Sequence, residues 1–193
     1  MNYRLKAVKD IVLTAMLTAT LSGGKLALIL IFNVEVVTLF IIVYACVFGL
    51  KISLTSTLIF VTLECFLHGF GTWVLLYFIH WPTLCVFSFL LTKLLPSYSK
   101  KGARYYAARL VAYTSLAIIL TAAFGVTSSL IDALIGAGRT SFAFTYLFPI
   151  IYLRGVPFYI THVVSNTVIV AVCFLPLSSF LYKLKAKYYG QLG

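Results

Sequence analysis

The chain has 193 residues, of which 62% are hydrophobic and only 10% are charged, whereas soluble domains average about 45–50% apolar and about 25% charged residues. So few charged residues cannot cover a surface in water, which excludes a soluble protein. The net charge of +11 comes from Lys and Arg residues clustered between long apolar runs, a distribution that indicates membrane topology rather than binding of nucleic acid.

Six apolar segments follow one another along the chain. A membrane-spanning helix needs about 20 apolar residues, so six of them fill residues 1–193 as a single transmembrane domain and leave no room for a soluble catalytic domain. The sequence therefore predicts an all-α integral membrane protein, a compact bundle of six transmembrane helices. The expected helices are Ala7–Ile31, Val34–Leu50, Ser53–Leu67, Thr72–Leu95, Ala107–Ile135 and Val156–Leu184.

The basic residues predict the orientation of this bundle. With the N-terminus in the cytoplasm and an even number of spans, most Lys and Arg residues fall on the inner side, as the positive-inside rule requires. Both termini are then cytoplasmic, as in a multi-pass protein of a prokaryotic plasma membrane. The connection Gly136–Gly155 is then external, and we expect it to form a long loop of the kind that serves as a lid or binding loop.

Polar residues within the apolar segments gather on the external side of this topology. Ionisable groups at membrane depth normally face a cavity or a partner, so we expect these residues to converge on a solute. The candidate binding residues are Asn33, Glu35, His68, Trp73, Tyr77, Asp132, Arg139, Arg154, Tyr159, His162 and Asn166.

Several of these residues also have a purely structural interpretation. Asn33 can cap the second helix, with Glu35 in its first turn. Glu64 lies four residues before His68, and His162 four residues before Asn166, so each pair shares a helical face and can form interhelical hydrogen bonds. We expect no metal site, because no third ligand is at suitable spacing.

An aromatic stripe follows the fourth segment at spacings of three and four. It comprises Trp73, Tyr77, His80 and Trp81. Such a stripe is typical of core packing and of the aromatic belt at a membrane interface, but it also suits a flat wall against a planar solute.

Motifs of catalysis are missing from the sequence. It has no G-x-S-x-G, no phosphate-binding glycine loop and no metalloprotease helix motif. We therefore expect a protein that is not an enzyme and needs no cofactor.

Two stretches resemble the substrate-binding S components of energy-coupling factor (ECF) vitamin transporters. One is Ala15-Met16-Leu17-Thr18-Ala19 in the first segment, and the other is Phe32-Asn33-Val34-Glu35-Val36-Val37-Thr38-Leu39, followed by Val47-Phe48-Gly49-Leu50-Lys51. The resemblance extends over the whole chain in length, helix number and orientation. It implies vitamin uptake by an ECF-type ABC transporter, in which Ala15 and Ala19 contact a transmembrane scaffold subunit and two ATPase subunits supply the energy.

The outer polar and aromatic residues suit a solute with amide and ring surfaces. Cobalamin is the first candidate, with pyridoxine, pantothenate and folate as alternatives. A different class of function, a small carrier outside the ECF family or a membrane scaffold protein, also fits the composition. Association with ATPase subunits distinguishes an S component from both.

Overall fold

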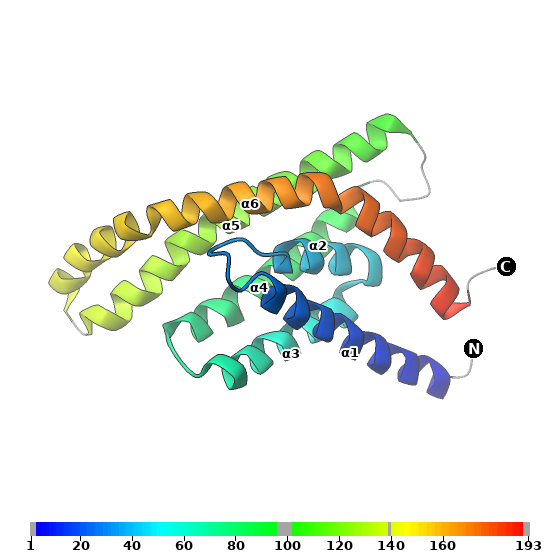
Figure 1. Ribbon diagram of the computed structural model, residues 1–193, viewed down its shortest axis with the longest axis horizontal. Coiled ribbons are helices and arrows are strands. Elements are labelled where there is room, and N and C mark those ends of the chain that lie inside the picture. The colour runs from blue at the N-terminus through cyan, green and yellow to red at the C-terminus, as the bar shows by residue number, and fades with distance from the viewer. Residues whose placement is uncertain (1–2, 96–101, 139, 191–193) are drawn as a thin grey trace.

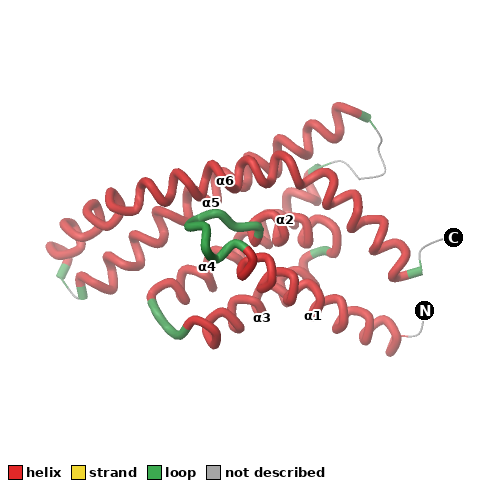
Figure 2. Tube along the Cα trace, viewed as in Figure 1, coloured by secondary structure: helices red, strands yellow, loops and turns green. Residues whose placement is uncertain are grey.

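The computed structural model describes residues 3–95, 102–138 and 140–190, and this part of the chain is helical throughout except for short connections (Figure 2). It contains six helices and no strands, which confirms the predicted all-α class and the number of helices. The helices are α1 (Tyr3–Ala27), α2 (Val37–Phe48), α3 (Leu50–His68), α4 (Thr72–Leu94), α5 (Ala103–Ala137) and α6 (Ser141–Tyr189).

Consecutive helices run in opposite directions, so the start of α1 and the end of α6 lie at the same end of the molecule (Figure 1). Hydrogen bonds join these two helices there. Lys9 donates to the carbonyl oxygen of Tyr188 at 2.7 Å, and the Tyr189 hydroxyl donates to Asp10 Oδ1 at 2.5 Å. An even number of alternating helices thus brings the two ends of the chain together.

The short helix α2 is the centre of the bundle. Its side chains from Val37 to Val47 are nearly all buried, and Ile41 and Ile42 are completely so. It packs against α4 and α6 and also contacts α1, α3 and α5. A helix that is apolar on every side is stable only when other elements surround it, which explains this position.

The helix α2 is shorter than the predicted segment Val34–Leu50. The helix begins at Val37, and a single residue, Gly49 with φ of +84°, separates it from α3. A left-handed backbone of this kind favours glycine because a Cβ atom would be strained. With 12 residues, α2 is about 18 Å long, shorter than the hydrocarbon core of about 30 Å.

Four of the helices in the described part are long and apolar enough to cross a membrane, namely α3, α4, α5 and α6. The helix α1 carries Arg4, Lys6, Lys9 and Asp10 in its first turns and Lys25 in its last. The helices α3, α4, α5 and α6 indicate a membrane protein. The predicted count of six spans stays a prediction.

The prediction of a long loop at Gly136–Gly155 is wrong. Only residues 138–140 separate α5 from α6, and α6 continues for 49 residues through Pro149, Pro157 and Pro176. Phe144, Phe148 and Tyr152 stack along one face at ring separations of 6.0 Å. This spacing of four residues supports a helix, and the glycine and proline content of the segment concealed it. The α5–α6 pair therefore extends beyond the other helices (Figure 1).

Candidate solute-binding site

A pocket of about 190 Å³ lies where the connection between α1 and α2 meets α4, α5 and α6. The connection between α1 and α2 lies on the side of the bundle away from the start of α1 and the end of α6, and the α5–α6 pair extends beyond it (Figure 1). The residues that line it are Lys25, Leu28, Ile29, Ile31, Phe32, Asn33, Val34, Glu35, Val37, Tyr77, Trp81, Phe124 and His162. Five helices and the α1–α2 connection thus contribute to one pocket.

Glu35 is the acidic residue of this pocket. One carboxylate oxygen accepts the backbone N–H of Thr38 at 2.8 Å, and the other lies 3.4 Å from Nε2 of His162. Burial raises the pKa of Glu35, but the hydrogen bonds with His162 and Thr38 outweigh it, so the pKa lies below its ordinary value. Glu35 therefore presents a carboxylate to the pocket.

The cap of α2 differs from the prediction. Glu35, and not Asn33, accepts an N–H of the first turn, and it does so from outside the helix. Asn33 adopts a left-handed backbone with φ of 55°, which asparagine tolerates well. Its carbonyl oxygen accepts the hydroxyl of Ser165 at 2.9 Å. This bond fixes the connection between α1 and α2 against α6.

Aromatic rings of α4 and α5 also line the pocket. The centre of the Tyr77 ring lies 5.1 Å from that of Trp73 and 5.7 Å from that of Trp81, and both pairs are edge to face. Phe124 on α5 contacts the His162 ring at 5.1 Å, also edge to face. The predicted stripe on α4 therefore lines the pocket through Tyr77 and Trp81 and also packs against Phe124 of α5, which supports the packing interpretation. Its role as a wall for a solute stays a prediction.

A buried ion pair lies beside these aromatic rings. Lys25 of α1 forms a salt bridge with Glu64 of α3, and His68 Nδ1 is 3.3 Å from the same carboxylate oxygen. The Glu64 side chain is completely buried, and its other oxygen has no hydrogen-bond partner among the described residues. The Lys25 ammonium also lies 4.8 Å from the centre of the Tyr77 ring. Glu64 and His68, predicted to share a helical face, thus belong to a three-residue cluster in which Glu64 makes the interhelical contact with Lys25.

Asn166 lies on α6 about one helical turn after the pocket residue His162 and is completely buried. Its amide donates to the hydroxyls of Thr38 and Thr121, both at 3.3 Å. It thereby joins α6 to α2 and α5, as the interhelical interpretation predicts. Among the described residues, no three His, Cys, Asp or Glu side chains are close enough to hold a metal ion.

Comparison of the chain with protein-family models, curated protein sequences and solved structures finds no match. The resemblance to S components therefore stays a prediction.

The structure brings some of the predicted binding residues together and leaves others apart. Those in or beside the pocket are Asn33, Glu35, Trp73, Tyr77, His162, Asn166 and, through Glu64, His68. Those on the extended α5–α6 pair, outside the pocket lining, are Asp132, Arg154 and Tyr159. Arg139 lies outside the described residues.

The three distant residues lie on α5 or α6 toward the connection between them. Asp132 and Arg154 are each eight residues from a pocket residue, Phe124 and His162 respectively, which corresponds to about 12 Å along a helix. Arg154 is exposed and Asp132 is half-buried. Tyr159 instead holds the two helices together, because its hydroxyl is 2.8 Å from that of Ser129.

Among the residues that line the pocket, Phe124 and Lys25 are absent from the predicted binding residues, and Trp81 was expected near a solute only as part of the aromatic stripe. Phe124 is one aromatic residue within a long apolar segment and gives no signal. Lys25 and Glu64 do give one, because opposite charges inside separate apolar segments need a partner.

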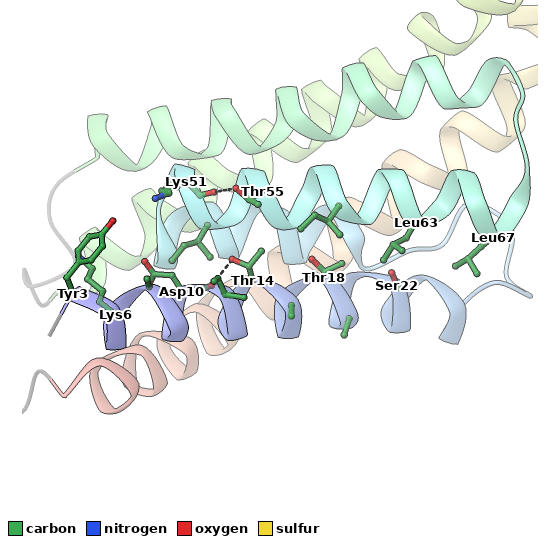
Figure 3. A pocket seen from close by; sticks show the side chains of 16 residues that line it. Tyr3, Lys6, Asp10, Thr14, Thr18, Ser22, Lys51, Thr55, Leu63 and Leu67 are labelled. Atoms are coloured by element: carbon green, nitrogen blue, oxygen red, sulfur yellow. Dashed lines mark hydrogen bonds between the residues drawn. The ribbon is translucent and has the colours of Figure 1, made fainter. Parts of the chain in front are cut away.

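A second, larger concavity runs along the outside of α1 and α3, with a volume of about 1020 Å³ (Figure 3). We call it the α1–α3 groove. Its lining combines alanine, isoleucine and leucine side chains with charged side chains at the end near the start of α1, and the hydroxyls of Thr14, Thr18 and Ser22 follow α1 along the groove. The lining residues are Tyr3, Lys6, Ala7, Asp10, Ile11, Thr14, Ala15, Thr18, Ala19, Ser22, Lys51, Ile52, Thr55, Ile59, Leu63 and Leu67.

Ala15 and Ala19 lie in this groove and are exposed. The buried face of α1 is formed instead by Leu13, Leu17 and Leu21. Packing within the described bundle therefore does not use the two alanines, which leaves a face of small residues open to another helix.

Proposed function

We propose that this chain is a multi-pass membrane protein that binds a small organic solute in the pocket around Glu35 and His162. The pocket itself is the observation that carries this proposal. A carboxylate from the α1–α2 connection, an imidazole from α6 and aromatic side chains from α4 and α5 meet in one concave site. Small-molecule sites are typically concave and largely apolar, with a few polar groups that orient the ligand.

The orientation follows from the basic residues. The end of the molecule that holds both termini carries the clusters at the start of α1 and the end of α6, including Lys6 and Lys185, together with Lys51 and Lys93. We assign this end to the cytoplasm by the positive-inside rule. The pocket then faces outward, where a nutrient is captured, and the start of α1 and the end of α6 face the cytoplasm.

The α1–α3 groove supports a role as the S component of an ECF-type ABC transporter. An exposed Ala15 and Ala19 on a membrane helix permit close approach of a partner helix. We propose that a transmembrane scaffold subunit occupies this groove and that two ATPase subunits drive uptake.

The size of the pocket favours a compact vitamin over cobalamin. Its volume of about 190 Å³ lies below the roughly 300–1,000 Å³ of sites for drug-sized ligands. Cobalamin is much larger than such ligands. Among the candidates, a single-ring solute of the pyridoxine type fits best.

Binding is measurable from the intrinsic fluorescence of the purified chain. The protein has two tryptophans, of which Trp81 lines the pocket and Trp73 packs on Tyr77. We expect pyridoxine to change this fluorescence, and His162→Ala to weaken its binding by about 5- to 150-fold, because about 1–3 kcal/mol is lost with a buried polar partner.

Arg154→Ala is the matched control, because Arg154 is exposed on α6 outside the pocket lining. It should bind pyridoxine as the wild type does. Equal binding by the His162 variant and the wild type would place the solute elsewhere.

The orientation has its own test. A cysteine at Thr140, exposed at the α5–α6 connection, should react with a membrane-impermeant maleimide in intact cells. A cysteine at Lys187, near the end of α6, should react only after the cells are opened. The reverse pattern would invert the topology and place the pocket in the cytoplasm.

A further inference from the structure

We infer that the pocket selects a small aromatic solute that carries a positive charge. This inference rests on the proposed solute-binding function and names its substrate class. It comes from the distribution of charge and aromatic rings around the pocket.

The charges at the pocket are unequally satisfied. The Lys25 ammonium is paired with Glu64, so its charge is already balanced by a completely buried carboxylate. Glu35 has a neutral backbone donor and His162, whose Nε2 lies 3.4 Å from the carboxylate oxygen. Charge-assisted hydrogen bonds are typically about 2.7–2.9 Å long. Glu35 thus keeps acceptor capacity for a cationic ligand, because a carboxylate offers about four lone-pair positions.

The aromatic wall adds a second attraction for a cation. Tyr77, Trp81 and Phe124 border the same pocket, and the face of an aromatic ring attracts positive charge. The position of the Lys25 ammonium, 4.8 Å from the centre of the Tyr77 ring and 6.0 Å from that of Trp73, is an instance of this attraction within the chain. A flat cationic ring can stack on this wall while its charge lies near Glu35.

An anionic solute meets the opposite situation. It would approach the Glu35 carboxylate, and the fixed cation of the pocket, Lys25, is engaged by Glu64. Drawing Lys25 away from Glu64 would leave a buried carboxylate without its counter-ion, which is strongly unfavourable. Repulsion by the Glu35 carboxylate and the loss of the Lys25 counter-ion from Glu64 therefore both disfavour the binding of an anion.

Three probes of one ring system test the charge without changing the shape much. They are 1-methylnicotinamide, a cation; nicotinamide, which is neutral; and nicotinate, an anion. Tryptophan fluorescence of the purified full chain in detergent gives the dissociation constant of each. We expect the cation to bind most tightly and nicotinate most weakly, with about tenfold or more between them.

Glu35→Gln should reduce the difference between cation and anion to about threefold or less, since the amide keeps the shape and removes the charge. Asp132→Asn is the matched control, because it removes an acid on α5 outside the pocket lining. It should keep the wild-type preference. The charge series on the wild type alone decides the question if Glu35→Gln does not fold.

Tighter binding of nicotinate than of 1-methylnicotinamide would overturn the inference. So would pyridoxine binding without any response to the three probes, although the proposed function would then stand. No response to pyridoxine or to any of the three rings would contradict both the inference and the proposed function.

Discussion

Replacing Lys25 with methionine is expected to lower the free energy of unfolding by about 3–5 kcal/mol, because a buried charge loses its partner. Glu64 is completely buried and its second oxygen has no partner among the described residues. Loss of the Lys25 ammonium leaves this carboxylate with His68 alone. For a chain of this size, the change corresponds to about 6–20 °C in Tm, measurable by thermal unfolding in detergent.

The double variant Lys25→Met with Glu64→Gln separates the ion pair from other effects of the substitution. It removes both charges, so it should recover most of the lost stability. Lys51→Met is the matched control, because Lys51 is exposed at the other end of α3, and surface substitutions usually change stability by less than about 0.5 kcal/mol. A double variant as unstable as Lys25→Met would show that the pair is not what stabilises this region.

Ala19→Trp is expected to abolish assembly with the scaffold subunit. Ala19 is exposed in the α1–α3 groove, and close approach of two membrane helices depends on small residues between them. An indole at this position fills the groove and separates the helix backbones. Because Ala19 is not packed inside the bundle, the isolated chain should still fold and bind pyridoxine. Purification through an affinity tag measures the partners retained.

Met16→Trp is the matched control for the groove. Met16 lies on α1 between the two alanines in sequence and is 58% exposed, but it is not part of the groove lining. This variant should assemble as the wild type does. Loss of solute binding with assembly intact in Ala19→Trp would assign the groove to the solute instead.

The helices were largely predictable because apolar runs and their breaks are local features of the sequence. The predicted Thr72–Leu95 agrees with α4, and the predicted Ser53–Leu67 lies within α3. The start of α6 was not predictable in the same way. Gly155 and Pro149 suggested a loop, whereas aromatic stacking at helical spacing along α6 outweighs them.

The site was predictable in its residue types but not in its pairings. Polar groups within apolar segments identified Glu35 and His162, which are 127 residues apart in sequence and meet only because the α1–α2 connection folds against α6. The Lys25–Glu64 pair likewise joins two helices. Arg154 was placed near the solute because α6 was expected to begin after it, and the longer helix carries it away from the pocket.

The composition of the complex purified from host membranes through the wild-type chain tests the central claim most directly. A substrate-binding subunit that docks through the α1–α3 groove should retain one transmembrane scaffold subunit and two ATPase subunits, and solute uptake should require ATP hydrolysis. Recovery of the chain without these subunits, with uptake driven by an ion gradient or with no uptake at all, would contradict the account.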